Sequence, residues 1–254
     1  MVRHKHNHSK SFVYLYIREY NQSIRASAIY MRYIAIEGCM GAGKSTLVDM
    51  LQRSRETEAF GVRSVLQEPV KDWGPLLAEF YENPQRNALV LQLEILRSRV
   101  QQLLDAEVDF GLSGDDIILV ERSIESSSDV FVPMMSKNVD DTGDVLMSPR
   151  DVFAYKKWQT TMEGIMHEKH HELAGIIFID AEPETCLNRI KSRARDGEAK
   201  ISLGYLEHLR DQYHAWLGAM QEKGITVTVV RSHDGEEGMQ RLHDDTVDSL
   251  VRMI

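Results

Sequence analysis

GCMGAGKS, residues 38–45, is the stretch of this chain that decides its fold. It fits G-x-x-x-x-G-K-[ST] at every fixed position, and it lies between the apolar run Tyr33–Ile36 and an amphipathic stretch, after a strand and at a helix start. Glycines let such a backbone curl around an anion, and the helix N-terminus adds positive charge. Lys44 then reaches the β- and γ-phosphates, and Ser45 binds Mg²⁺. The predicted phosphate-binding residues are Gly38, Cys39, Met40, Gly41, Ala42, Gly43, Lys44, Ser45 and Thr46.

Composition narrows the class of partner. The chain has 254 residues, and no stretch reaches the roughly 18 apolar residues that span a bilayer. The formal charge of −9 argues against a broad nucleic-acid-binding surface and favours a small-molecule substrate. The two cysteines, Cys39 and Cys186, fall in the phosphate loop and a predicted helix, so we expect no disulfide and a reducing compartment. We predict a cytoplasmic protein without nucleic-acid or membrane partners.

Residues 1–32 differ from the rest, with six Lys or Arg and a single acid, Glu19. Three interpretations stay open: a disordered basic leader, a targeting segment that would place the protein in the mitochondrion, or an extension upstream of a true start at Met31. His4, His6 and His8 alternate there, and alternating histidines in a flexible tail seldom converge on one metal ion. We assign residues 1–32 to the leader and 33–254 to one domain.

Strand and helix patterns alternate beyond the leader. Short apolar runs predict strands at Tyr33–Glu37, Arg63–Gln67, Ile117–Val120, Gly175–Ile179 and Ile225–Val230. Helices are predicted at Ser45–Thr57, Pro84–Val108, Ile124–Met135, Pro149–Glu172, Glu182–Arg195, Ser202–Lys223 and Glu236–Met253. Apolar strands separated by helices form a parallel sheet covered on both faces. The predicted fold is α/β, with a five-stranded parallel sheet flanked by helices.

Charged residues follow two predicted strands at the edge where such folds bind ligands. Glu68, after the second strand, can accept a proton from an attacking hydroxyl; the alternative is a solvated strand-end acid. Glu121, after the third strand, can hold Mg²⁺, and Arg122 beside it can neutralise phosphate oxygens. An ordinary surface ion pair is the alternative for these two residues.

A basic segment follows near residue 190. Arg189 and Arg193 share one face of a predicted helix, and Arg195 follows at its end. Cations beside a transferring phosphoryl group stabilise the charge that develops in the transition state. A solvated basic helix end is the alternative.

These segments, in this order, resemble the eukaryotic-type deoxyribonucleoside kinases: deoxycytidine and deoxyguanosine kinases, mitochondrial thymidine kinase and the insect multisubstrate enzyme. The similarity runs from Tyr33 to the C-terminus and rests on several separate motifs. It implies a P-loop kinase fold with an arginine-rich lid, the cofactors ATP and Mg²⁺, a deoxynucleoside substrate and a homodimer. The implied reaction is transfer of the ATP γ-phosphoryl to the substrate 5′-hydroxyl, as in nucleotide salvage.

The resemblance assigns catalytic roles by position. Glu68 would take the proton from the 5′-hydroxyl, Glu121 would accompany Mg²⁺, and Arg122 would position phosphate. The lid arginines would be Arg189, Arg193 and Arg195.

Other residues would bind the nucleoside. Tyr81 and Glu198 correspond to residues that hold the sugar 3′-hydroxyl, and Gln92 to one that pairs with the nucleobase edge. A glutamine suits this role because its amide offers a donor and an acceptor side by side. Phe131 and Trp73 would supply apolar faces around the base, with simple core packing as the alternative.

Base preference is where the pattern departs from the family. Deoxycytidine and deoxyguanosine kinases carry an arginine, an aspartate and an alanine at three pocket positions, which correspond here to Arg99, Ser127 and Ile95. Ile95 narrows the pocket floor, which disfavours purines. Ser127 frees Arg99 from its acidic partner, so that the arginine swings out or contacts the base alone. We expect broad specificity that leans towards pyrimidine deoxynucleosides.

Two other functions share features with this one. A nucleoside monophosphate kinase, such as a thymidylate kinase, has the same loop and lid, but its acceptor carries a phosphate and needs extra cations. A non-catalytic relative would keep the fold as a structural or regulatory subunit, and it would usually have lost the loop lysine or the base. Lys44, Ser45, Glu68 and Glu121 are all present.

Overall fold

The computed structural model describes residues 31–110, 116–137, 145–169, 171–195 and 197–254. They contain a five-stranded parallel sheet in the order β2-β3-β1-β4-β5, which confirms the predicted α/β fold. Of the predicted leader, only Met31 and Arg32 are described, and both belong to β1. The strands are β1 (Met31–Gly38), β2 (Val62–Leu66), β3 (Ile117–Glu121), β4 (His171–Asp180) and β5 (Thr226–Arg231).

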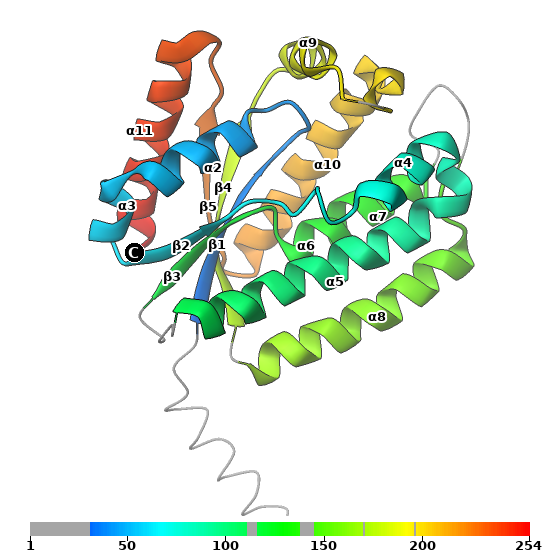
Figure 1. The fold of residues 1–254 in the computed structure, drawn as a ribbon, viewed down its shortest axis with the longest axis horizontal. Coiled ribbons are helices and arrows are strands. Elements are labelled where there is room, and N and C mark those ends of the chain that lie inside the picture. Colours follow the sequence, from blue (N-terminus) through cyan, green and yellow to red (C-terminus); the bar gives the residue numbers. More distant parts are fainter. Residues whose placement is uncertain (1–30, 111–115, 138–144, 170, 196) are drawn as a thin grey trace, which may run out of the picture.

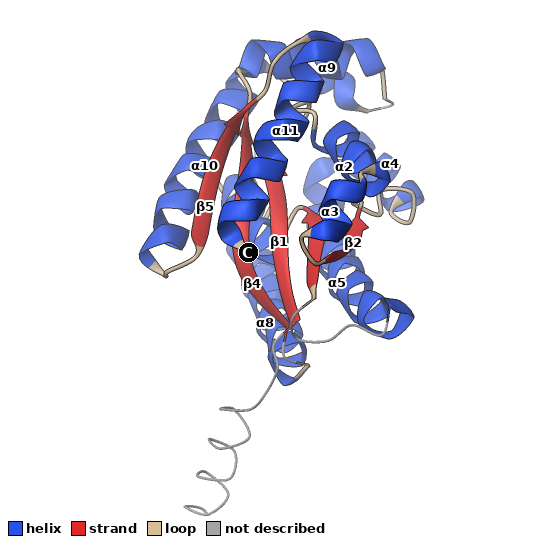
Figure 2. Ribbon diagram, turned by 90° about the vertical axis from the view of Figure 1, so that its left-hand side faces the viewer, coloured by secondary structure: helices blue, strands red, loops and turns tan. Residues whose placement is uncertain are grey.

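Helices cover both faces of the sheet. Figure 1 shows α2, α3 and α11 on one side and α5, α6, α8 and α10 on the other, and Figure 2 shows the same layers from the side. The helices are α2 (Lys44–Arg53), α3 (Arg55–Ala59), α4 (Gly74–Glu82), α5 (Pro84–Phe110), α6 (Ile124–Ser126), the π-turn η1 (Ser127–Phe131), α7 (Val132–Met135), α8 (Pro149–Glu168), α9 (Pro183–Arg193), the 3₁₀ turn η2 (Glu198–Lys200), α10 (Leu203–Glu222) and α11 (Gly235–Met253).

Strand order places the functional edge. β1 lies at the centre of the sheet, with β3 and β2 on one side and β4 and β5 on the other. The side chains of β1, β3 and β4 are almost all buried, as expected for strands covered on both faces. The carboxyl end of β1 is therefore the point where the strand order reverses, and ligands of such folds bind in the crevice outside it.

Several element bounds differ from the predictions. The predicted helix 149–172 ends at Glu168, because His171 and Glu172 pair with Met31 and Arg32 of β1 as the start of β4. The predicted helix 45–57 is two helices, divided at Ser54, whose hydroxyl accepts a hydrogen bond from Glu56 N at 3.2 Å. Sequence analysis missed α4 entirely and did not anticipate the π-turn within 124–135.

The hydrophobic core surrounds the sheet, and a smaller cluster of Trp73, Leu91 and Ile95 lies apart from it, packed against side chains of α4. Cys39 and Cys186 are buried free thiols. No helix in the described part of the chain is both long and apolar enough to cross a membrane.

Candidate active site

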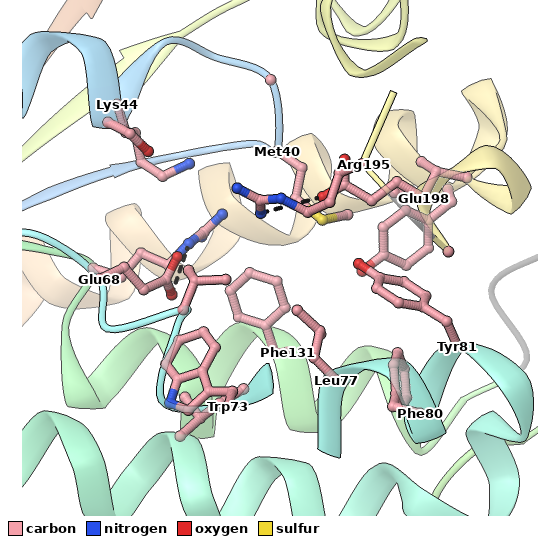
Figure 3. A pocket seen from close by; sticks show the side chains of 18 of the residues that line it. Met40, Lys44, Glu68, Trp73, Leu77, Phe80, Tyr81, Phe131, Arg195 and Glu198 are labelled. Carbon is pink, nitrogen blue, oxygen red and sulfur yellow. Dashed lines mark ion pairs between the residues drawn. The ribbon is translucent and has the colours of Figure 1, made fainter. Parts of the chain in front are cut away.

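A cavity of about 540 Å³ opens at the carboxyl edge of the sheet. The phosphate loop, the ends of β2 and β3, helices α4 and α5, and the segment around Arg195 contribute to its wall. Figure 3 shows Lys44 and Glu68 at one end, Tyr81 and Glu198 at the other, and Phe131 and Leu77 between them. The cavity thus joins a phosphate site to a pocket that extends away from it.

The phosphate loop has the predicted shape. Gly43, with a φ of 102°, precedes α2, and the Lys44 ammonium donates hydrogen bonds to the carbonyl oxygens of Gly38 (3.1 Å) and Cys39 (2.9 Å). Burial, and then the charge of Arg122, lower the pKa of Lys44 to about 8. A buried cation with a lowered pKa is stabilised when an anion binds beside it, so the loop is suited to phosphate.

The carboxylate of Glu121, the hydroxyl of Ser45 and the backbone N–H of Glu68 meet beside the loop. Ser45 Oγ donates to Glu121 Oε1 at 2.7 Å, and Glu121 Oε2 accepts from Glu68 N at 3.3 Å. Hydroxyl and carboxylate oxygens are the ligand types that Mg²⁺ prefers, so Ser45 and Glu121 fit the ion. Among the residues with a described position, no group of three or more His, Cys, Asp or Glu could hold a metal by itself. Such a site suits an ion that also takes phosphate oxygens and water as ligands.

Glu68 lies between two arginines. Its Oε1 pairs with Arg99 Nη2 and lies 3.5 Å from Arg122 Nε. Burial acts to raise the pKa of Glu68, but the charges of Arg122 and Arg99 outweigh it and hold that pKa below its ordinary value. Glu68 is therefore an ionised carboxylate at neutral pH, which is the form that a general base needs.

Arg122 is held by a buried network that sequence analysis missed. Its Nη1 donates to Tyr213 OH and lies 3.9 Å from Glu37 Oε2, and Tyr213 donates to the same Glu37 oxygen at 2.9 Å. Glu37 is fully buried and also accepts from Ser123 N and Oγ. An acid at the end of the apolar run before the phosphate loop was the available sequence signal for Glu37. Nothing in the chain marks Tyr213.

Around Trp73 the wall of the cavity is largely apolar, and Gln92 contributes a polar side chain to it. Gln92 is 3% exposed, and its Oε1 has no hydrogen-bond partner among the residues that the structure describes. Trp73 donates from Nε1 to Ser98 Oγ at 2.9 Å and packs with Leu91 and Ile95. An orphaned acceptor in an apolar pocket is satisfied when a ligand brings an N–H group to it.

Arg99 contradicts one expectation. The absence of an aspartate at 127 does not free this arginine, because its Nη1 donates to Ser127 Oγ and to Ser123 O (2.8 Å) while Nη2 pairs with Glu68. Ser127 contacts Arg99 but does not itself line the cavity. The π-turn places Ser127 and Phe131 at its two ends, so that only Phe131 reaches the pocket.

The lid arginines divide into two groups. Arg193 makes a two-point contact with Glu198, both N···O distances being 2.8 Å, and Arg195 lies 3.5 Å from the same carboxylate. Arg189 points away from them: it donates to the carbonyl oxygens of Gly41 and Ala42 (both 3.3 Å) and to Asp234 Oδ1 (2.8 Å). Arg189 therefore joins the phosphate loop to the segment before α11, while the other two arginines face Glu198.

Tyr81 completes this end of the cavity. Its ring lies against Gly197, whose φ is +84°, and a Cβ at Gly197 would lie 2.3 Å from ring carbons. Burial, and then Glu198, raise the pKa of Tyr81 to about 12, so its hydroxyl stays protonated and can donate to a ligand.

The cavity brings together most residues that sequence analysis selected. Four of them do not line it: Gly38, Cys39 and Ala42, whose backbone shapes the loop, and Ser127. Lining residues that the analysis missed share apolar or cationic side chains without a motif; they include Val70, Leu77, Phe80, Met135, Lys137 and Lys200.

A phosphate loop that faces an adjoining acceptor pocket, with arginines beside it, defines a phosphotransferase of the P-loop kinase fold. Residues 34–252 match the family model for deoxynucleoside kinases. The chain is 30% identical to a probable deoxycytidine kinase of fowlpox virus over 208 residues, which are 80% of this chain and 79% of the relative. It is also 30% identical to rat deoxycytidine kinase (74% and 75%) and to deoxyadenosine kinase of Dictyostelium discoideum (77% and 70%).

The chain belongs to the deoxynucleoside kinase family. It is an ATP-dependent phosphotransferase that phosphorylates deoxynucleosides, and its fold is that of the P-loop kinases.

Proposed function

We propose that this enzyme transfers the γ-phosphoryl of ATP to the 5′-hydroxyl of a deoxynucleoside, with a preference for pyrimidines, using Glu68 as the general base. The observation that carries the proposal is the position of Glu68: its carboxylate is ionised, it lines the cavity, and its backbone N–H donates to Glu121 beside the phosphate loop. A hydroxyl that enters from the pocket would meet the base and the donor phosphates at one place.

Each residue then has a defined task. Lys44 and the loop N–H groups bind the donor phosphates, and Arg193 and Arg195 turn from Glu198 towards the charge of the transferring group. Ser45 and Glu121 would hold Mg²⁺, which supplies positive charge to the phosphate oxygens when bound. Gln92 orients the base, and Tyr81 with Glu198 binds the sugar. Because little bond-making is left to the protein in such a transfer, positioning supplies most of the rate.

Pyrimidine preference rests on the depth of the pocket. Ile95 and Trp73 fill its floor, and the Trp73–Ser98 hydrogen bond fixes the indole ring there. The free Gln92 Oε1 takes an N–H donor, and the amide nitrogen beside it supplies the matching donor, which suits thymine and cytosine alike. Ranking kcat/KM for thymidine, deoxycytidine, deoxyuridine, deoxyadenosine and deoxyguanosine tests this preference. A purine at the head of the ranking would contradict it.

The same assay identifies the acceptor. Thymidine monophosphate is included at the same concentration, and the products are separated as mono- and diphosphates. We expect monophosphates from the nucleosides and little product from the nucleotide. Turnover of the nucleotide alone would instead assign the enzyme to monophosphate phosphorylation.

We also propose a homodimer formed through α5 and α8. Only Tyr155 and Met166 of α8 are buried, whereas Phe153 and Trp158 on the same helix are exposed by 65% and 53%. Val90 on α5 is also exposed, and α5 packs beside α8, so the two helices leave apolar side chains uncovered. A second copy would cover them by the same surface on both subunits.

Light scattering after size-exclusion chromatography tests the homodimer. We expect a mass of two chains for the full chain and of one chain for Trp158→Glu. Val229→Glu, on β5 and 51% exposed, is the matched control that should stay dimeric. A monomeric wild type would contradict the proposal. The cytoplasmic location, and the absence of nucleic-acid and membrane partners, stay predictions.

A further inference from the structure

Arg99 is almost fully buried on α5, and its guanidinium group is held on several sides. Nη1 donates to Ser127 Oγ and to Ser123 O, and Nη2 donates to Glu68 Oε1. Among its nitrogens only Nε lacks a partner within the described residues. Three of the five N–H groups of Arg99 are therefore already used on protein oxygens.

The charges around Arg99 explain why it turns to Glu68. Ser123 and Ser127 offer neutral oxygens, and Glu68 is the acid with which Arg99 forms an ion pair. A buried guanidinium pairs with a carboxylate because desolvation makes an unpaired charge costly. Ser127 therefore accepts a hydrogen bond from Arg99 without neutralising its charge, and Glu68 supplies the opposite charge.

Two arginines approach the same oxygen of Glu68. Arg99 Nη2 pairs with Oε1, and Arg122 Nε lies 3.5 Å from it, so the carboxylate is held from both α5 and the end of β3. Arg99 comes from the 27-residue helix α5, and Arg122 follows β3. Two rigid elements thus fix the direction of one carboxylate, which is how a base is pre-oriented.

We propose that Arg99 is a positioning residue for the general base, and that Ser127 is required to be neutral so that Arg99 stays on Glu68. Arg99 fixes the Glu68 carboxylate and does not select the nucleobase. This inference rests on the proposed function of Glu68 as the base.

A double-mutant cycle on the full chain tests the inference. The variants are Arg99→Gln, Glu68→Gln and the two combined, assayed with ATP and either thymidine or deoxycytidine. We expect Arg99→Gln to lower kcat by about tenfold or more for both nucleosides, with a smaller change in KM. In the Glu68→Gln background, Arg99→Gln should lower kcat by less than about threefold, because the carboxylate through which Arg99 acts is already gone.

Arg97→Gln is the matched control. Arg97 lies on the same helix, its side chain is 52% exposed, and it pairs with Glu94 on the surface. We expect kcat, KM and the nucleoside ranking to remain those of the wild type. The inference is overturned if Arg99→Gln lowers kcat by the same factor in the wild-type and Glu68→Gln backgrounds. It is also overturned if Arg99→Gln leaves kcat unchanged and alters the ratio of kcat/KM for thymidine to that for deoxycytidine by about tenfold or more.

Ser127→Asp provides a second variant that keeps the arginine. A carboxylate at 127 would compete with Glu68 for Arg99, so kcat should fall for both nucleosides while their ranking is kept. Thermal unfolding and ATP binding establish that each variant is folded. If Arg99→Gln does not fold, the kinetics of Ser127→Asp decide the question. An unchanged kcat in folded Ser127→Asp, or a reversed ranking, would also overturn the inference. Failure of the proposed function looks different: the wild type would make no monophosphate from any nucleoside.

Discussion

Glu68 shows how single residues set the chemistry of this site. Burial alone would favour its neutral form, yet Arg122 and Arg99 lower its pKa, so the carboxylate is ionised at neutral pH. We expect Glu68→Gln to reduce kcat by roughly 10²–10⁴-fold with a smaller effect on nucleoside KM, since the amide keeps the shape and loses the basicity. Steady-state kinetics with saturating ATP measure the effect.

Glu82→Gln is the control for that substitution, because Glu82 is an exposed acid at the end of α4 and outside the cavity lining. It should leave kcat and KM unchanged. Near-normal turnover by Glu68→Gln, with thermal unfolding showing a folded protein, would remove Glu68 from the role of base.

At the scale of elements, the packing of the Tyr81 ring from α4 against the segment before η2 requires a glycine at position 197. A Cβ there would lie 2.3 Å from carbons of the Tyr81 ring, and the φ of +84° also disfavours other residues. Gly197→Ala should therefore move Tyr81 away from Glu198 and weaken the hold on the sugar. We expect KM for a 2′-deoxynucleoside to rise by about tenfold or more.

A 2′,3′-dideoxynucleoside separates this effect from general damage, because it lacks the hydroxyl that Tyr81 and Glu198 would bind. The KM for the dideoxynucleoside should change less than that for the parent compound. Gly218→Ala on α10 is the control, since a Cβ at Gly218 meets nothing within 4 Å. Equal changes for both substrates would show that Gly197 has no specific link to the 3′-hydroxyl site.

Elements defined by local pattern were predictable, and those defined by distant contacts were not. Apolar runs identified β1 and β3 from the sequence, and a long stretch of apolar residues at helical spacing identified α5. The start of β4 was missed because His171 is polar and takes part in the sheet only through its register with Met31. The π-turn η1 was missed because a single extra residue in a helical turn leaves no clear periodic signal.

The whole molecule shows the same division for its site. Lys44 and Glu121 were predictable because Lys44 follows β1 and Glu121 ends β3, and the carboxyl ends of these strands lie at one edge of the sheet. Gln92 lies on α5, and its place in the site was predicted from the resemblance to the family. The role of Arg99 was not, because it depends on Ser127 and Glu68, which lie on separate elements. Residue type alone said that an acidic partner was missing at 127, and only the packing shows that Glu68 replaces it.

A second, smaller cavity links the stability of the whole molecule to pH. Its wall includes Tyr33, Glu125, Glu163, His167 and His171, contributed by β1, α6, α8 and β4. Tyr33 OH donates to Glu125 Oε1 at 2.7 Å, while Oε2 has no hydrogen-bond partner in the described part of the chain. Burial raises the pKa of Glu125, only partly offset by the hydrogen bond from Tyr33. The folded protein therefore binds this proton more tightly than the unfolded chain does.

The sign of the effect follows from the raised pKa. The stability contributed by protonated Glu125 is complete below the ordinary pKa of a glutamate and is lost as pH rises through the higher folded value. Glu125→Gln cannot ionise, so its melting temperature should gain on that of the wild type as pH increases from about 5 to 8. His167, His171 and Glu163 are present in both proteins, so the two proteins differ only at position 125. Glu168→Gln, exposed on α8, should show no such gain. If the difference in melting temperature between wild type and Glu125→Gln stays constant across this pH range, Glu125 ionises as freely in the folded protein as in the unfolded chain.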